Sequence, residues 1–425
     1  MPLTTRGPRS TPITAILVAL LTTGLVVASG AASSAVSPRA GAQAPAAADM
    51  GDASTEPGQA AQIASLIRTS MRNDHLRAVI LKVSVDGKNV ITRAFGESMT
   101  GVPARTDMHF RNGSVSIGYI ANVLLQLVDD GTVSLDDKVS RWLPDIPHAN
   151  EVTLGQLARM TSGYQDYVRD QTFIEGFLAN PFRHWTTLDQ LEAGAVKPLW
   201  FEPGTGWSYA HTNYVILGLA LEKITGMPLR ELLRTRVLKP LGLDQTRASV
   251  NAPIPEPVLH AFSAERRDFL GIPDGTPFYE ESSFWNPSWT LAQGAIQTTD
   301  IDDLHATAIA FGTGALLSRK SYRASISTDL RGFGSPVPGC DTCATQTVRY
   351  SYGIGLVTTG DWIMQNPLFG GYSAVTAYLP SERIAIAIAV TYKAAAFENN
   401  GPINQAQMLF RQIGALLAPE SAPPT

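Results

Sequence analysis

A serine that opens an apolar helical segment is the first residue to consider for chemistry. Ser114 follows Gly113, and the apolar residues after it recur with the spacing of a buried helix, at Ile117, Ile120, Val123, Leu124 and Leu127. A serine in the first turn of such a helix can act on a substrate, because the free N–H groups of the helix point at whatever the serine attacks. Serine also caps helices very often, so a purely structural role for Ser114 is the alternative.

The chain has only two cysteines, Cys340 and Cys343, and they are three residues apart. In an exported chain this spacing predicts a small disulfide that closes a loop, and we expect it to lie far from the chemistry. A thioredoxin-like site would need the pair to begin a helix after a strand, whereas Pro336 and Pro338 predict a loop. The seven histidines lack metal-ligand spacing, so we expect no metal and no cofactor.

The first 57 residues have the composition of an export signal followed by a tether. Residues 1–12 contain two arginines and no acidic residue, and residues 13–28 are apolar. Small residues follow, so we expect a signal peptide in residues 1–36 and a secreted or envelope protein. A retained membrane anchor is the alternative. Residues 37–57, rich in Ala, Ser and Pro, predict a flexible linker.

The rest of the sequence has the composition of one large globular body. Hydrophobic residues make up 44% of the chain, which is ample for a core, and no later segment is apolar over a membrane-spanning length. The net charge of −4 provides no basic field. We therefore do not expect nucleic acid as a partner.

Predicted strands lie at both ends of this body and predicted helices lie between them. Residues 78–85 and 89–96 flank a turn at 86–88 and predict a hairpin, which a helix at 59–71 precedes. Strands at both ends imply that the two ends build one sheet and that the middle is a helical insertion. The later strand patterns are 352–357, 373–379 and 384–391, and the later helix patterns are 152–160, 214–225, 229–237 and 403–417.

Short segments in a fixed order carry a resemblance over roughly residues 58–417. They are 110–127, 136–139, 157–163, 203–226, 286–289, 299–304 and 371–373. Together they resemble the serine beta-lactamase-related family, which includes class C beta-lactamases, D-alanyl-D-alanine carboxypeptidases and related esterases.

The resemblance implies an α/β (α+β) fold with its active site in a cleft. An antiparallel sheet flanked by helices would be built from residues 58–112 and 290–417. An all-helical subdomain would occupy residues 113–289, and residues 418–425 would form a tail.

The first motif of the family is Ser-x-x-Lys, in which the lysine lies one helical turn after the serine and takes its proton. Ser114 matches the nucleophile, but Ile117 occupies the position of the lysine. An isoleucine can neither accept a proton nor stabilise charge. The usual activation of Ser114 is therefore missing.

The second motif is Tyr-x-Asn on a loop of the helical subdomain, where the tyrosine carries a proton and the asparagine holds the substrate amide. This sequence reads Tyr209-Ala210-His211. The resemblance implies that Tyr209 and His211 face Ser114. Without it, Tyr209 would be a partly buried aromatic residue and His211 a residue at a helix start.

The third motif, Lys-Thr-Gly or His-x-Gly on an edge strand, docks a substrate carboxylate and helps to form an oxyanion hole. Counting back from Gly371 at the family spacing gives Gln365-Asn366-Pro367. Gln365 has no charge and Pro367 has no backbone N–H group. Gln365, Asn366 and Gly371 are therefore the candidate substrate contacts, without the usual cation.

The altered motifs leave two classes of function open. The favoured hypothesis is a catalytically impaired homologue near the cell wall that binds a small peptide, an ester or a cell-wall fragment, because loss of an activating partner commonly costs orders of magnitude in rate. The alternative is an active esterase or peptidase that uses Ser114 with Tyr209 and His211. A purely structural role is a third hypothesis.

Overall fold

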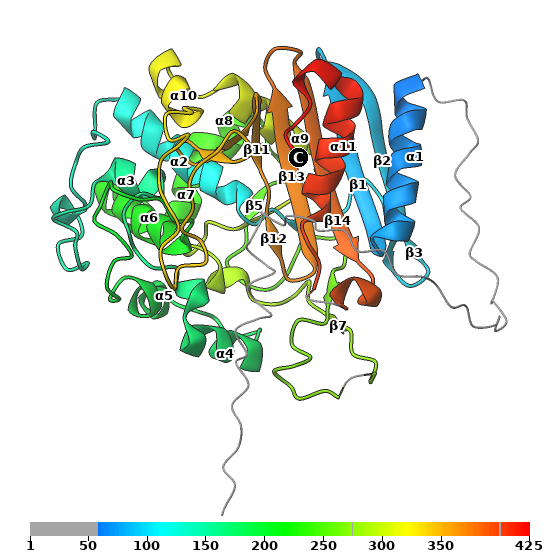
Figure 1. Cartoon of the computed structure of the whole chain (residues 1–425), viewed down its shortest axis with the longest axis horizontal. Coiled ribbons are helices and arrows are strands. Elements are labelled where there is room, and N and C mark those ends of the chain that lie inside the picture. Colours follow the sequence, from blue (N-terminus) through cyan, green and yellow to red (C-terminus); the bar gives the residue numbers. More distant parts are fainter. Residues whose placement is uncertain (1–57, 274, 399–400) are drawn as a thin grey trace, which may run out of the picture.

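An antiparallel sheet of nine strands forms the centre of the described protein (Figure 1). The computed structural model describes residues 58–425 apart from residues 274 and 399–400. The strand order is β3-β2-β1-β14-β13-β11-β10-β9, and β12 pairs with β13. The strands are β1 (Leu76–Val85), β2 (Lys88–Met99), β3 (Val102–Pro103), β9 (Ser351–Tyr352), β10 (Val357–Thr359), β11 (Trp362–Gln365), β12 (Leu368–Phe369), β13 (Tyr372–Leu379) and β14 (Ile384–Tyr392).

The two ends of the chain meet in the middle of this sheet. Strand β1 pairs with β14 over nearly its whole length, for example Val79 with Val390 and Val83 with Ile386. Every residue of β14 is buried, and its sequence alternates isoleucine with alanine. Helices cover both faces of the sheet, so both sets of side chains leave water. Helices α1 (Gly58–Asn73) and α11 (Gln405–Leu417) lie on one face, and α9 (Ile301–Thr313) lies on the other (Figure 1).

The remaining helices gather beside the sheet, on the left in Figure 1. Two small sheets connect this part to the main sheet, with the strand orders β4-β8-β5 and β6-β7. The elements are α2 (Val115–Asp129), α3 (Leu154–Ala158), α4 (Gln171–Ala179), α5 (Thr187–Gly194), α6 (His211–Thr225), α7 (Leu229–Leu233), α8 (Lys239–Leu241), α10 (Arg319–Ser325), β4 (Phe110–Arg111), β5 (Arg247–Ala248), β6 (Phe262–Ser263), β7 (Glu280–Glu281) and β8 (Gln297–Thr299). Short helical turns are η3 (Val139–Arg141), η4 (Tyr167–Arg169), the π-helical η5 (Arg234–Leu238), η6 (Pro287–Trp289), η7 (Ala394–Phe397) and η8 (Pro419–Ser421).

The predicted fold class, an antiparallel sheet flanked by helices, is confirmed. The prediction that residues 113–289 are all-helical is wrong, because the short strands β5, β6 and β7 lie within them. The prediction of one strand over residues 352–357 is wrong, because residues 353–356 belong to no strand and separate β9 from β10. Gly355 lies in this break with a φ of +71°, and a Cβ there would collide with the side chain of Ala121 on α2. The predicted helix at 229–237 is also interrupted, since α7 passes into the π-helical turn η5.

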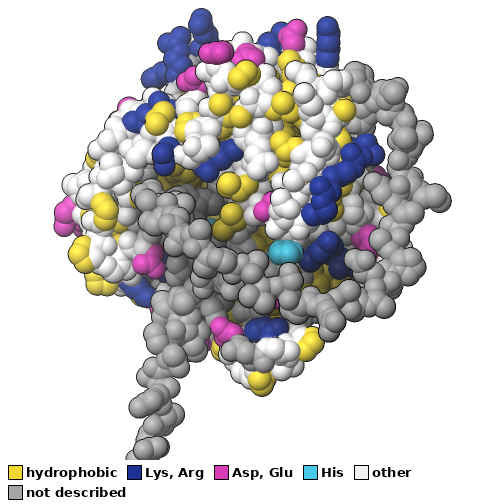
Figure 2. All heavy atoms as spheres, turned by 45° about the vertical axis from the view of Figure 1, so that its right-hand side comes forward, with side chains coloured by type: hydrophobic (Ala, Val, Ile, Leu, Met, Phe, Trp, Pro, Cys, Tyr) yellow, Lys and Arg dark blue, Asp and Glu magenta, His cyan; other side chains and the backbone are white. Residues whose placement is uncertain are grey.

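The end of the chain packs against the sheet. The indole N–H of Trp362 donates a hydrogen bond to the carbonyl of Ser421 at 2.7 Å, and Pro423 lies against α11 close to Gly414. The signal peptide and linker predicted for residues 1–57 lie outside the described residues. Among the described helices, none combines the length and the apolar character that crossing a bilayer requires. On the face in Figure 2, basic and acidic side chains are interspersed.

Candidate active site

Ser114 begins α2, and its hydroxyl is not used as a helix cap. The residue occupies the N-cap position, but its side chain makes no capping hydrogen bond. Gly113 before it has a φ of +50°, and a Cβ there would lie 2.6 Å from the Cβ of Pro367. Glycine is therefore required at this turn both for its backbone conformation and because Pro367, between β11 and β12, approaches so closely. The hydroxyl of Ser114 stays available for chemistry.

The first turn of α2 differs from the expectation that its N–H groups are free. The N–H groups of Val115, Ser116 and Ile117 donate to carbonyls three residues back, at 3.0–3.1 Å. These groups cannot also bind a substrate without breaking the turn. The amide N–H of Ser114 itself has no acceptor among the described residues.

The position of the family lysine lies inside the core. Ile117 is fully buried, and its backbone carbonyl faces Gly355 in the break between β9 and β10. Burial of an aliphatic side chain stabilises the fold, but it supplies no proton acceptor beside Ser114. Activation of the serine must therefore come from another element.

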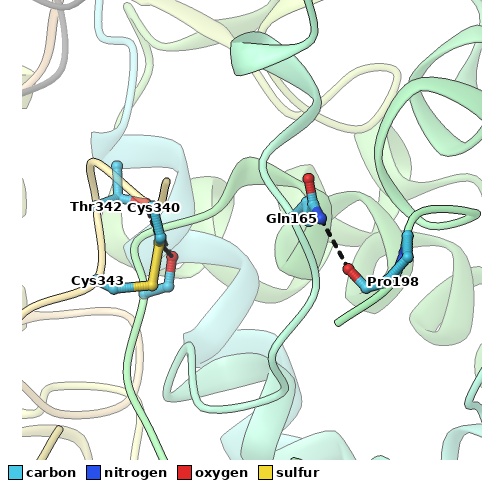
Figure 3. Close-up of a disulfide and its surroundings, with 6 residues drawn as sticks. Gln165, Pro198, Cys340, Thr342 and Cys343 are labelled. Carbon is cyan, nitrogen blue, oxygen red and sulfur yellow. Dashed lines mark hydrogen bonds between the residues drawn. A yellow bond between two sulfur atoms is a disulfide. The ribbon is translucent and has the colours of Figure 1, made fainter. Parts of the chain in front are cut away.

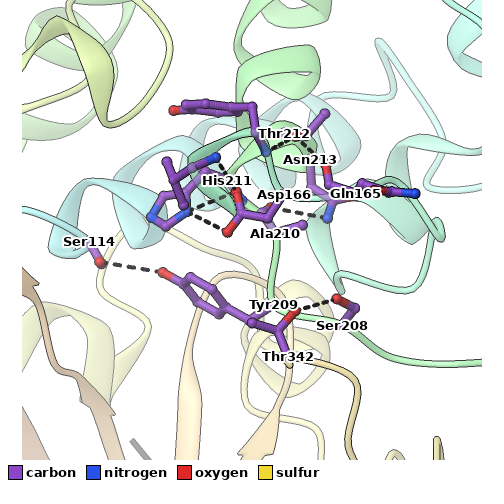
Figure 4. A network of polar contacts seen from close by, with 12 residues as sticks. Ser114, Gln165, Asp166, Ser208, Tyr209, Ala210, His211, Thr212, Asn213 and Thr342 are labelled. Atoms are coloured by element: carbon purple, nitrogen blue, oxygen red, sulfur yellow. Dashed lines mark hydrogen bonds and ion pairs between the residues drawn. The ribbon is translucent and has the colours of Figure 1, made fainter. Parts of the chain in front are cut away.

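Tyr209 reaches Ser114 from the loop before α6. Its hydroxyl donates a hydrogen bond to Ser114 Oγ, at a long 3.4 Å (Figure 4). Burial raises the pKa of Tyr209 well above its usual value, the hydrogen bond with Ser114 lowers it, and the charge of Asp166 raises it further. Tyr209 is therefore a neutral donor near pH 7. It can pass a proton along only if another group accepts one from it.

His211, the candidate for that proton acceptor, lies next to Tyr209. His211 is the first residue of α6, and its Nδ1 lies 3.0 Å from a carboxylate oxygen of Asp166. The backbone N–H of His211 also donates to Asp166, at 3.0 Å. The side chains of His211 and Asp166 are only 7% and 2% exposed. A carboxylate on Nδ1 fixes the imidazole so that Nε2 carries the lone pair, which is how a carboxylate orients a general base.

The structure brings Ser114, Tyr209 and His211 together, as the resemblance implied. The rings of Tyr209 and His211 meet edge to face, with centroids 5.3 Å apart. In the described structure His211 makes no direct hydrogen bond with Ser114, whereas the hydroxyl of Tyr209 does (Figure 4). Sequence reasoning missed Asp166. Its only local signal is that of a cap for the short turn η4, which does not indicate a partner 45 residues away.

The segment that replaces the third motif lies beside the nucleophile but directs its amides inward. Gln365 is 2% exposed and its Nε2 donates to the carbonyl of Gly355 at 2.6 Å. Asn366 donates to Gln407 at 2.9 Å. Pro367 is the residue that packs against Gly113. Substrate binding by Gln365 and Asn366 stays a prediction, and these contacts do not support it.

Gly371, the remaining candidate contact, is held by packing. It has a φ of +79°, and a Cβ there would collide with the carbonyl of Phe262. Strand β6 therefore lies too close to position 371 for any side chain there. A role for Gly371 in substrate binding also stays a prediction.

The disulfide between Cys340 and Cys343 is confirmed (Figure 3). The expectation that it lies far from the chemistry is wrong. Ser208, directly before Tyr209, forms a β-bridge with Cys343. The loop that the disulfide closes therefore touches the segment that carries Tyr209. Sequence spacing predicts the bond but contains no information about what folds against it.

Among the described residues, no group of three or more His, Cys, Asp or Glu side chains is arranged to hold a metal ion.

Parts of the chain are similar in sequence to known proteins. Penicillin-binding protein 4* of Bacillus subtilis is 32% identical over 164 residues, which cover 37% of this chain and 34% of that protein. Esterase EstB of Burkholderia gladioli is 31% identical over 199 residues, which cover 43% of this chain and 50% of that protein. The chain thus aligns with about a third to a half of the length of these relatives.

A solved structure extends the likeness to most of the chain. The D-stereospecific amidohydrolase from Streptomyces sp. superimposes with a TM-score of 0.66 at 25% identity, and the match covers 79% of this chain and 94% of that one. The profile of the Beta-lactamase family matches residues 63–407. The chain therefore belongs to the Beta-lactamase family, a family of serine hydrolases.

Proposed function

We propose that this protein is a slow serine hydrolase that cleaves small, uncharged esters or amides with Ser114 as the nucleophile. The observation that carries the proposal is that Ser114, Tyr209 and the Asp166–His211 pair lie together: Tyr209 is hydrogen-bonded to Ser114 and its ring packs edge to face against His211. In this proposal His211, on α6, takes the role of base that the family lysine would have.

The proposed reaction begins with attack of Ser114 Oγ on the substrate carbonyl carbon. The serine proton moves to Nε2 of His211, either directly or through the hydroxyl of Tyr209, and Asp166 stabilises the imidazolium that forms. His211 then returns the proton to the leaving alkoxide or amine, which leaves an acyl group on Ser114. Water, deprotonated in the same way, releases the acid and restores the serine.

The rate is expected to be low because the proton path is long. Tyr209 lies at 3.4 Å from Ser114, beyond the usual range for an O–H···O hydrogen bond. The rings of Tyr209 and His211 are in edge-to-face contact at 5.3 Å between centroids, but no hydrogen bond joins the two side chains among the described residues. Catalytic hydrogen bonds often tighten only when substrate binds, so this geometry fits a weak enzyme.

The substrate class follows from the end of β11, which lies beside the turn before Ser114. The family cation is replaced by Gln365, which is buried and donates inward to Gly355. A carboxylate-bearing substrate would lack its anchor, whereas a neutral ester or amide would need none. The names of two similar proteins, an esterase and a D-stereospecific amidohydrolase, support these two bond types.

The test compares the purified wild-type protein with Ser114→Ala and Ser116→Ala. Ser116 is a matched control because it is a buried serine of the same turn whose hydroxyl donates to Asn112. Hydrolysis of a p-nitrophenyl ester should disappear in Ser114→Ala and persist in Ser116→Ala. Equal turnover by wild type and Ser114→Ala would overturn the proposal.

A second candidate is a non-catalytic protein that binds a peptide, an ester or a cell-wall fragment in the same cleft. The observation that favours it is the full burial of Ile117 together with the raised pKa of Tyr209, which leaves Ser114 hydrogen-bonded to a donor and not to a base. Absence of turnover by the wild-type protein, together with retained binding of cell-wall fragments, would favour this candidate.

We also propose that the protein acts outside the cytoplasm, at or near the cell wall. The proposal rests on the arginines and the apolar run of residues 1–28 and on the polar, proline-containing segment before residue 58. N-terminal sequencing of protein recovered from the medium or the envelope should find a start after residue 28. An intact N-terminus in the membrane fraction would instead indicate a retained anchor.

A further inference from the structure

We propose that the disulfide loop, residues 340–343, is a positioning element that holds both Tyr209 and the Asp166–His211 pair in place. This inference rests on the proposed function and deepens it. It assigns a role to a loop that touches no substrate in the proposed reaction. This one loop makes two sets of contacts, one with Ser208 and one with Arg169.

The first set fixes the segment that carries Tyr209. Ser208 pairs with Cys343 through a β-bridge, and its hydroxyl lies 2.8 Å from Thr342 Oγ1 (Figure 4). The same hydroxyl lies 3.7 Å from the sulfur of Cys340. Ser208 is 2% exposed, so few other groups can replace these partners. Because Tyr209 is the next residue, a shift of Ser208 moves the tyrosine that contacts Ser114.

The second set reaches the turn that carries Asp166. Arg169 ends η4, the turn that Asp166 caps, and its guanidinium lies 4.0 Å from the carboxylate of Asp341. The guanidinium nitrogens of Arg169 are buried and make no hydrogen bond to any residue that the structure describes. Asp341 therefore supplies the charge that faces this buried cation. The loop that contacts Ser208 thus also contacts the turn behind His211.

The disulfide makes these two contacts act together. Cys340 and Cys343 close the loop on either side of Asp341 and Thr342. Figure 3 shows the bond with Thr342 beside it. The closed loop restricts how far the backbone of these two residues can move apart. Without the bond, Asp341 and Thr342 could follow Arg169 and Ser208 separately. A misplacement of about 1 Å at a catalytic group can cost about 100-fold in rate. The loop should therefore influence turnover more than substrate binding.

The test uses three variants of the full-length protein. Cys340→Ala/Cys343→Ala removes the disulfide, and Thr342→Val removes the hydroxyl that meets Ser208. Thr342→Ser keeps that hydroxyl and is the conservative counterpart. Asp361→Asn, an exposed acid in the turn between β10 and β11, is the remote control.

The expected result is a separation of kcat from KM on a p-nitrophenyl ester. The double cysteine variant should lose about 10- to 100-fold in kcat and Thr342→Val about 3- to 10-fold, with KM changed less than about threefold. Thr342→Ser and Asp361→Asn should keep wild-type kcat. Dithiothreitol should act on the wild type like the cysteine substitutions, because it transfers two electrons and two protons to the disulfide and becomes a cyclic disulfide itself. Wild-type kcat in both the double cysteine variant and Thr342→Val would overturn the inference.

A second measurement separates this inference from the proposed function. Hydrogen–deuterium exchange of residues 207–213 should increase in the double cysteine variant and stay unchanged in Asp361→Asn. If the wild-type protein shows no turnover that depends on Ser114, the hydrolase proposal fails, and increased exchange still supports positioning by the loop. If turnover depends on Ser114 but exchange and kcat are unchanged in the double variant, the loop is not a positioning element.

Discussion

Replacement of His211 by asparagine tests the unusual base directly, because it restores the amide that the family has at this position. The substitution removes the imidazole whose Nδ1 lies 3.0 Å from Asp166. It leaves the backbone N–H of residue 211, which also donates to Asp166 at 3.0 Å. The carboxylate therefore loses its side-chain partner but keeps the backbone N–H groups of residues 211 and 168 as donors.

The magnitudes follow from this arrangement. A hydrogen bond to a charged group contributes about 1.5–3 kcal/mol, and the new side-chain amide can replace part of it, so we expect a loss of about 1–2 kcal/mol in unfolding free energy. A positioned general base contributes about 10²- to 10⁴-fold in rate. We therefore expect His211→Asn to lower kcat/KM at least about 100-fold while the protein stays folded.

The assay is hydrolysis of p-nitrophenyl butyrate between pH 5 and 9, with urea unfolding as the measure of stability. His148→Asn is the matched control, because the side chain of His148 is 37% exposed and, among the described residues, pairs with Glu151 alone. This control substitution also removes an imidazole, and it therefore measures how much ester hydrolysis an imidazole outside the active site contributes. Retention of both the wild-type rate and the wild-type pH profile in His211→Asn would refute the assignment of His211 as the base.

Other predictions concern the position of the family lysine, the missing cation, the tyrosine beside the nucleophile and a buried acid. Ile117→Lys should destabilise the protein by several kcal/mol in urea unfolding, about the cost of an unpaired buried charge, and should not reach ordinary turnover on a D-alanyl dipeptide. Fluorescent penicillin should give no stable, near-stoichiometric label in gels, because Gln365 offers no cation for its carboxylate. Tyr209→Phe should lower kcat/KM about 10- to 100-fold with Ser114 still present, and unchanged steady-state kinetics would exclude a proton-carrying role. Burial raises the pKa of Glu265 to about 7 from 4.5, so between these pH values the folded protein keeps a proton that the unfolded chain releases. The free energy of unfolding should therefore fall by about 3 kcal/mol as pH rises from about 4.5 to 7. Glu265→Gln should abolish this pH dependence in urea unfolding.

Local patterns in the sequence were sufficient to predict the helix that follows Ser114 and the first hairpin of the sheet. The helical spacing after Ser114 predicts α2, and the turn at 86–88 predicts the hairpin of β1 and β2. Each of these signals lies within about 20 residues. The spacing of Cys340 and Cys343 likewise predicts their bond.

Contacts between distant segments could not be predicted in this way. The carboxylate of Asp166 meets His211 across 45 residues, and only the folded chain brings the two together. The approach of Gly355 to Ala121 interrupts a strand that looks continuous in the sequence. The packing of the disulfide loop against Ser208 crosses more than 130 residues. Residues far apart in the sequence thus complete the site around Ser114.

The central claim is that Ser114 remains a nucleophile although its activating lysine is replaced by Ile117. The most direct measurement is the stoichiometry of labelling by a fluorophosphonate probe, read by mass spectrometry of the intact protein and of the peptide that contains Ser114. The account predicts slow labelling that approaches one probe per chain at Ser114 and is absent from Ser114→Ala. Labelling at the same rate and extent in Ser114→Ala, or none in the wild-type protein over many hours, would contradict it.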